Sequence, residues 1–84
     1  MDPEDRRMAM RKALAAEVRA RRAYLHMAQG ELIAASGLSR STIGRIENGE
    51  RDMDIPQLVA IAAALETTPA ELLQAATDAV RADA

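Results

Sequence analysis

Signals that begin and end helices divide this chain into short segments. Asp2-Pro3, Ser39, Asp54 and Thr68-Pro69-Ala70-Glu71 supply N-cap side chains, and the last stretch has the spacing of a capping box. Gly37 and Gly49 suit the left-handed residue that ends many helices. We therefore expect five short helices: one from Pro3 through Leu25, one from Gln29 to about Ala35, one from Arg40 to Asn48, one capped by Asp54 and running through Leu65, and one capped by Thr68 and running through Val80.

The apolar residues favour helices over strands. Aromatic residues make up only 1% of the 84-residue chain, so the core must consist of Leu, Ile, Val, Met and Ala. The β-branched and aromatic runs that mark strands are missing. A chain of this length supports one small core, which predicts a single compact all-α domain. With no cysteine there is no disulfide and no thiolate zinc site, and we expect a cytoplasmic protein without a membrane-spanning segment.

Charge is distributed unevenly along the chain. Residues 1–25 hold seven basic and four acidic side chains, whereas residues 52–84 hold one basic and six acidic side chains. The formal net charge of -2 argues, by itself, against a nucleic-acid binder. Two interpretations remain open: the charges solvate helix faces, or the domain turns one basic face toward a polyanion.

The segment 40–48 separates polar from apolar residues around a helix. At 100° per residue, one arc of about 140° holds Arg40, Ser41, Gly44, Arg45 and Asn48. Ile43 and Ile46 lie on the opposite side. Glycine destabilises a helix by roughly 1 kcal/mol relative to alanine. Close approach of another surface would explain why a glycine occupies position 44. Arginine can donate to O6 and N7 of guanine, so this face suits the major groove of DNA, although the spacing equally fits a solvated face.

Several motifs occur together at consistent spacing. Residues 29–39, QGELIAASGLS, precede the 40–48 segment and Gly49; Val18-Arg19-Ala20-Arg21-Arg22 lies upstream, Ile46-Glu47-Asn48-Gly49 closes the segment, and Leu58 to Leu65 follows. In this order they resemble the helix-turn-helix of the phage repressor and Cro type, the Xre family, over about Leu14 to Leu73. The resemblance implies a compact five-helix lambda-repressor-like DNA-binding domain over residues 14–82. Residues 1–13 would be a helical N-terminal extension continuous with the first helix.

The resemblance also implies roles for individual residues. The base-reading side chains would be Arg40, Ser41 and Arg45, and Gly44 would let the helix approach the bases closely. The residues that bind phosphates would be Gln29, Ser39, Asn48 and Arg51. Arg22 would form a structural pair with Glu47. Two departures are Ala28, where family members have a capping hydroxyl, and Ile33, where they have a smaller residue. Arg11, Arg19 and Arg21 are further candidates for the positive edge, with solvation as the alternative.

The function implied is that of a sequence-specific, double-stranded-DNA-binding transcriptional regulator, a repressor acting as a homodimer on an operator. The acidic C-terminal third offers Leu73 and Val80 as a dimer seam, unless both only cover the core, and the long N-terminal helix is a second candidate. The alternative function is a protein-interaction module, antitoxin-like or a regulatory adaptor.

We expect no enzyme, because His26 is the only histidine and no carboxylate pair adjoins a nucleophile. We likewise expect no cofactor, metal, membrane partner or small-molecule ligand.

Overall fold

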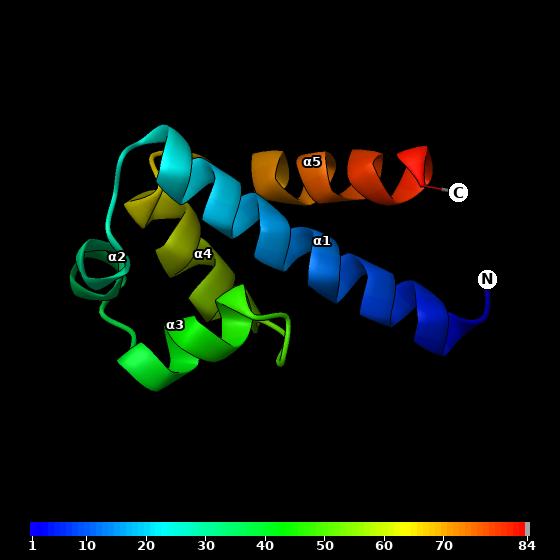
Figure 1. Cartoon of the computed structure of the whole chain (residues 1–84), viewed down its shortest axis with the longest axis horizontal. Coiled ribbons are helices and arrows are strands. Elements are labelled where there is room, and N and C mark those ends of the chain that lie inside the picture. The colour runs from blue at the N-terminus through cyan, green and yellow to red at the C-terminus, as the bar shows by residue number, and fades with distance from the viewer. Residues whose placement is uncertain (84) are drawn as a thin grey trace.

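The computed structural model describes residues 1–83, which form five α-helices and no strand (Figure 1). They are α1 (Pro3–Tyr24), α2 (Gln29–Ser36), α3 (Arg40–Glu47), α4 (Ile55–Ala64) and α5 (Pro69–Ala82). The predicted all-α class is confirmed, and the predicted ends lie within about two residues of those observed. The third helix ends one residue early, because Asn48 is its C-cap and Gly49 takes the left-handed conformation (φ 71°).

The N-caps follow the sequence signals, with one difference. Asp2, Ser39 and Asp54 each accept a backbone hydrogen bond at the start of α1, α3 and α4. Thr68 also caps α5, but the predicted capping box is incomplete. The Glu71 carboxylate accepts from the hydroxyls of Thr67 and Thr68 at 3.2 and 3.3 Å instead of from the Thr68 backbone N–H, because Thr67 places a second hydroxyl donor within reach.

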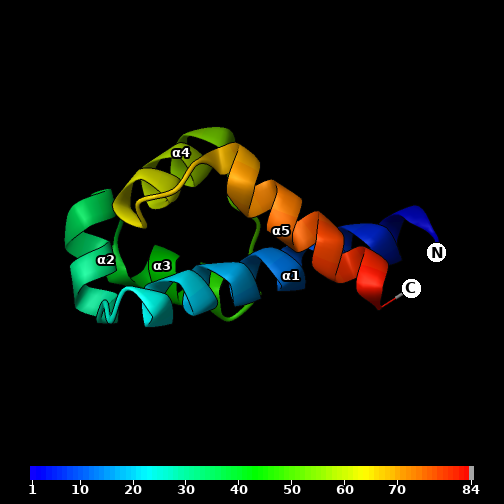
Figure 2. The same cartoon turned by 90° about the horizontal axis from the view of Figure 1, so that it is seen from above.

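The long helix α1 organises the rest of the molecule. Figures 1 and 2 show α1 running along the longest dimension, 37 Å, with α5 beside it. The N-terminal end of α1 and the C-terminal end of α5 lie at the same end of the molecule, and α2, α3 and α4 gather at the other end. Of residues 1–13, expected as an extension, residues 3–13 belong to α1 without a break, and Asp2 is its N-cap. Among residues 1–83, no helix is both long enough and apolar enough to cross a membrane.

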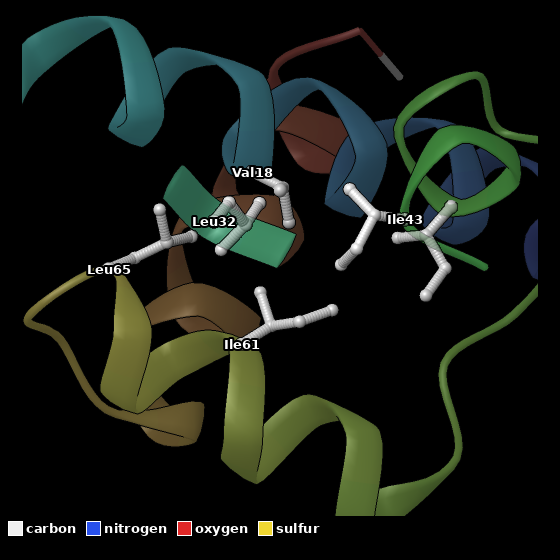
Figure 3. Packing of buried hydrophobic residues seen from close by; sticks show 6 residues of the cluster. Val18, Leu32, Ile43, Ile61 and Leu65 are labelled. Carbon is white, nitrogen blue, oxygen red and sulfur yellow. The ribbon is translucent and has the colours of Figure 1, made fainter. Parts of the chain in front are cut away.

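The core joins four of the helices through aliphatic side chains. Val18, Leu32, Ile43, Ile61 and Leu65 are fully buried and point toward one another (Figure 3). A second cluster of Leu58, Ala62 and Leu72 joins α5 to α4. The single aromatic residue, Tyr24, is 71% exposed and contributes nothing to this core. Packing without aromatic rings therefore holds α3 against α1, α2 and α4.

Candidate nucleic-acid interface

A tight turn connects α2 to α3. Gly37 has the predicted left-handed conformation, φ 73°, and its N–H donates to the Ile33 carbonyl at 3.0 Å. Leu38 then packs against the core, and its N–H donates to the Ser36 hydroxyl at 3.3 Å. Because two hydrogen bonds tie this turn to the end of α2 and Leu38 anchors it to the core, it fixes the direction in which α3 begins.

One face of α3 is exposed and carries two arginines. Arg40, Ser41 and Arg45 are exposed, whereas Ile43 and Ile46 keep 0% and 2% of their surface accessible. None of the three exposed side chains makes a hydrogen bond or ion pair with the part of the chain that the structure describes. Their donors are therefore available to a molecule outside the protein.

Gly44 lies between these side chains. A Cβ atom at this position would meet no heavy atom within 4 Å, and the residue has no left-handed backbone that would require glycine. Packing inside the chain therefore gives no reason for glycine here. The absence of a side chain leaves the middle of the exposed face open to close approach by another surface.

The carboxylate of Glu47 is the most buried charge of the site. Glu47 is 3% exposed, and its two oxygens accept from Nε and Nη2 of Arg22 at 2.8 and 3.2 Å. The amide of Gln29 adds a third hydrogen bond, to Oε1, at 2.9 Å. The structure thus brings Arg22 and Glu47 together and adds Gln29, a contact that sequence reasoning did not anticipate. A buried charge is stable only when paired and hydrogen-bonded, as here.

Arginines of α1 also bind backbone carbonyls. Arg22 donates to the Met27 carbonyl at 2.9 Å, and Arg19 donates to the carbonyl of Glu47 at the end of α3. Arg21 donates to the carbonyls of Leu65 and Glu66 at the end of α4, at 2.9 and 3.1 Å. Cations at helix C-termini are favourable because the carbonyls there lack partners. Arg19 and Arg21, considered for a positive edge or for solvation, instead tie α1 to the ends of α3 and α4.

Three of the four residues expected at phosphates lie near the two ends of α3, and the fourth, Arg51, lies in the loop that follows it. Gln29 and Asn48 are brought to one end, since Gln29 bonds the residue that precedes Asn48. Ser39 caps the other end, where its hydroxyl accepts from the Thr42 N–H at 3.1 Å and donates to the Thr42 hydroxyl at 2.9 Å. One N–H of the Gln29 amide is used by Glu47, which leaves its second N–H and its oxygen for another partner.

The loop between α3 and α4 is tied to α1. Arg11 donates to both carboxylate oxygens of Asp52, at 2.7 and 3.3 Å. This hydrogen bond from Arg11 lowers the pKa of Asp52, and Asp52 in turn raises the pKa of Arg11. Arg51 makes longer bonds, 3.3 Å to the Asp52 carbonyl and 3.5 Å to Gln57. Arg11, the third candidate for the positive edge, is thus held by an acid of the loop.

Large apolar side chains are exposed on the helices that follow. Ile55 and Val59, one turn apart on α4, are 70% and 51% exposed, and sequence reasoning did not single them out. Leu73 is 38% exposed, whereas Val80 is half-buried in a hollow between α5 and α1. The two residues considered for one seam therefore have different surroundings.

Comparisons with known proteins agree with this geometry. A family model described as "Helix-turn-helix domain" matches residues 13–75. The control protein C.SmaI of Serratia marcescens is 36% identical over 66 residues, covering 79% of each chain.

Two solved structures have a similar fold. The clp gene regulator ClgR of Corynebacterium glutamicum superposes with a TM-score of 0.82 at 27% identity, covering 88% of this chain and 79% of that one. The restriction-modification controller protein C.AhdI of Aeromonas hydrophila superposes with a TM-score of 0.71 at 31% identity, covering 74% of this chain and 94% of that one. The capped turn, the exposed face of α3 and these matches lead to one conclusion: the chain belongs to the helix-turn-helix family of DNA-binding regulators, of the phage repressor and Cro (Xre) type.

Proposed function

We propose that this chain represses transcription in the cytoplasm by binding an operator as a homodimer, with α3 in the major groove. The observation that carries the proposal is the exposed face of α3, where Arg40, Ser41 and Arg45 have no partner within residues 1–83. Such donors match guanine O6 and N7 and other base edges. Because Gly44 has no side chain, α3 can approach the bases closely at this position.

Phosphate contacts would set the register of this helix. Gln29 and Asn48 at one end of α3 and Ser39 at the other would bind the two strands that border the groove. Ser39 already uses its hydroxyl as a cap, so the exposed N-terminus of α3 would contribute backbone N–H groups beside it. Contacts of this kind position the protein, and base contacts select the sequence.

Dimerisation would supply the affinity that one short helix lacks. Two copies related by a two-fold axis read half-sites about 34–36 Å apart. We place the seam on Ile55 and Val59 of α4, because they form the largest pair of exposed aliphatic side chains on neighbouring turns of one helix. Exposed apolar side chains grouped in this way are typical of an interface.

The test is selection of bound DNA from a random pool, followed by mobility shifts of the selected sequence at increasing salt. We expect enrichment of a palindromic site and a dissociation constant that rises by roughly 10³-fold or more between 50 and 200 mM salt if six or more phosphates are contacted. Binding that selects no sequence, or that salt leaves unchanged, would instead favour the protein-interaction module.

A further inference from the structure

An arginine-rimmed hollow lies outside the helix-turn-helix itself. It has a volume of about 520 Å³ and separates the N-terminal half of α1 from the loop between α3 and α4, which pass beside each other in Figure 1. Its apolar side chains include Met10, Leu14 and Met53, and its arginines include Arg6, Arg7 and Arg51. The first ten residues of α1 precede the segment 13–75 that the family model covers, so most of one wall lies outside that segment.

The three arginines are available for an anion. Arg6 makes no ion pair or side-chain hydrogen bond within the described chain, and the bonds of Arg51 are long, at 3.3 and 3.5 Å. Arg7 is paired with Glu4 at 3.2 Å, but both side chains are more than half exposed. Exposed pairs of this kind contribute little, so Arg7 can exchange Glu4 for a stronger partner.

The acidic side chains near the hollow cancel only part of this charge. Asp52 is the acidic residue among those that line it, and both oxygens of that carboxylate accept from Arg11. The pair of Arg11 and Asp52 is neutral as a unit, and Glu4 balances Arg7 while those two are paired. Arg6 and Arg51 remain as excess positive charge along the rim, and Arg7 joins them once it releases Glu4. Arg51 also belongs to the loop that follows Asn48, so the rim continues from the C-terminal end of α3.

We infer that this hollow seats a stretch of the DNA sugar–phosphate backbone next to the stretch bound by the helix-turn-helix, with Arg6 and Arg7 on its phosphates. Deoxyribose offers apolar C–H groups to Met10, Leu14 and Met53, while the phosphates meet the guanidinium groups at the rim. Arginine binds phosphate through two parallel hydrogen bonds and keeps its charge at every physiological pH. The extension of α1 therefore lengthens the footprint on DNA without reading its sequence. This inference rests on the proposed function.

The test compares Arg6→Gln and Arg7→Gln, singly and together, with the wild-type chain on the selected operator. Each lost phosphate contact should reduce the slope of log binding constant against log salt by about 0.9, so the double variant should lose about 2 units of slope. The ranking of operator variants should stay unchanged. Arg81→Gln is the matched control: it removes the same charge from an exposed position outside the hollow and should leave the slope as it is.

Ethylation of individual phosphates provides a second measurement that does not depend on how the variants fold. Ethyl groups at the added phosphates should impair binding of the wild-type chain and have no further effect on the double variant. If the wild type binds its operator but the double variant keeps the same slope and the same interference pattern, the inference is wrong and the proposed function stands. If the wild type shows no specific, salt-dependent binding, the proposed function fails and the inference fails with it.

Discussion

The side-chain amide of Gln29 donates a hydrogen bond of 2.9 Å to the buried carboxylate of Glu47. Glu47 also receives two bonds from Arg22, so one side chain joins the end of α3 to the start of α2 and to the last turn of α1. Gln29, which was expected at a phosphate, therefore also uses its amide to bind the Glu47 carboxylate that holds α3 in place. We therefore predict that changes at Gln29 affect both the stability of the fold and DNA binding.

Replacing Glu47 with alanine should destabilise the fold. The guanidinium of Arg22, whose side chain is only 23% exposed, would lose both of its carboxylate bonds, and Gln29 would lose its partner. Removing one member of a buried pair costs about 3–5 kcal/mol, and the partial exposure of Arg22 places this case near about 3 kcal/mol. For a domain of this size that lowers the melting temperature by more than about 10 °C. Glu50→Ala, at an exposed position three residues later, serves as the control, and a melt of Glu47→Ala that coincides with wild type contradicts the structural role.

Arg45→Ala and Gln29→Ala should have different effects on DNA binding. Loss of Arg45, which has no intramolecular partner among the described residues, should relax sequence preference at one base pair by about 1–3 kcal/mol and leave the melt unchanged. Loss of Gln29 should weaken binding to all sequences alike and also reduce stability by about 1.5–3 kcal/mol, since its hydrogen bond is to a charged group. Mobility shifts at a temperature where both variants are folded separate the two effects. Equal losses on every sequence from both variants would refute this division of roles.

Gly44→Ala should stabilise the free protein and weaken DNA binding. Nothing lies within 4 Å of the added methyl group, and alanine is favoured over glycine in a helix by about 1 kcal/mol, so the melting temperature should rise. If α3 lies against the bases, the same methyl group would have no room there, and overpacking of about 1–3 kcal/mol would reduce affinity by a factor of about 5 to 150. Thermal melts and mobility shifts of one preparation check both halves. A variant that binds as tightly as wild type would show that α3 does not approach DNA at Gly44.

Local sequence signals predicted the fold well because each depends on a few neighbouring residues. The caps Asp2, Ser39 and Asp54 and the left-handed Gly37 and Gly49 were all recognisable from side-chain chemistry and spacing. The incomplete capping box at Thr68 shows where such local prediction fails. The hydroxyl of Thr67, one residue earlier, competes for the Glu71 carboxylate and changes which donor it binds.

Long-range contacts of polar residues were harder to predict. The bonds from Arg11 to Asp52 and from Arg21 to the end of α4 join residues 41 and 44 positions apart. No sequence motif relates Arg11 to Asp52 or Arg21 to the end of α4 by a fixed spacing. Helix periodicity therefore predicted only that Arg11 and Arg21 lie at the surface. The family resemblance supplied Arg22 with Glu47, but not Gln29 as their third member, because its expected role was at a phosphate. Exposure of Ile55 and Val59 likewise depends on how α4 packs.

Stability at acid pH should depend on the pair of Arg11 and Asp52. Arg11 holds the pKa of Asp52 below its unfolded value of about 3.9, so the contribution of the pair is present above that value and is lost as pH falls through the folded pKa. Asp52→Asn should therefore melt below wild type at pH 6, and the difference should shrink below about pH 4. Melts across this range provide the measurement, and Arg11→Gln should give the same pH profile. If the double variant shows the sum of the two single effects, the two side chains do not interact in solution.

Serine at both Ile55 and Val59 should dissociate the proposed dimer without unfolding the chain. The two side chains are 70% and 51% exposed in the single chain, so their removal leaves the core intact and changes its stability by no more than about 0.5 kcal/mol. Sedimentation should show a dimer for wild type and a monomer for the double variant, and mobility shifts should show a loss of cooperative binding to the two half-sites. Tyr24→Ser, which removes an equally exposed large side chain on α1, should remain a dimer. If the double variant stays dimeric while Leu73→Ser becomes monomeric, the seam lies on α5, where the acidic C-terminal third first suggested it.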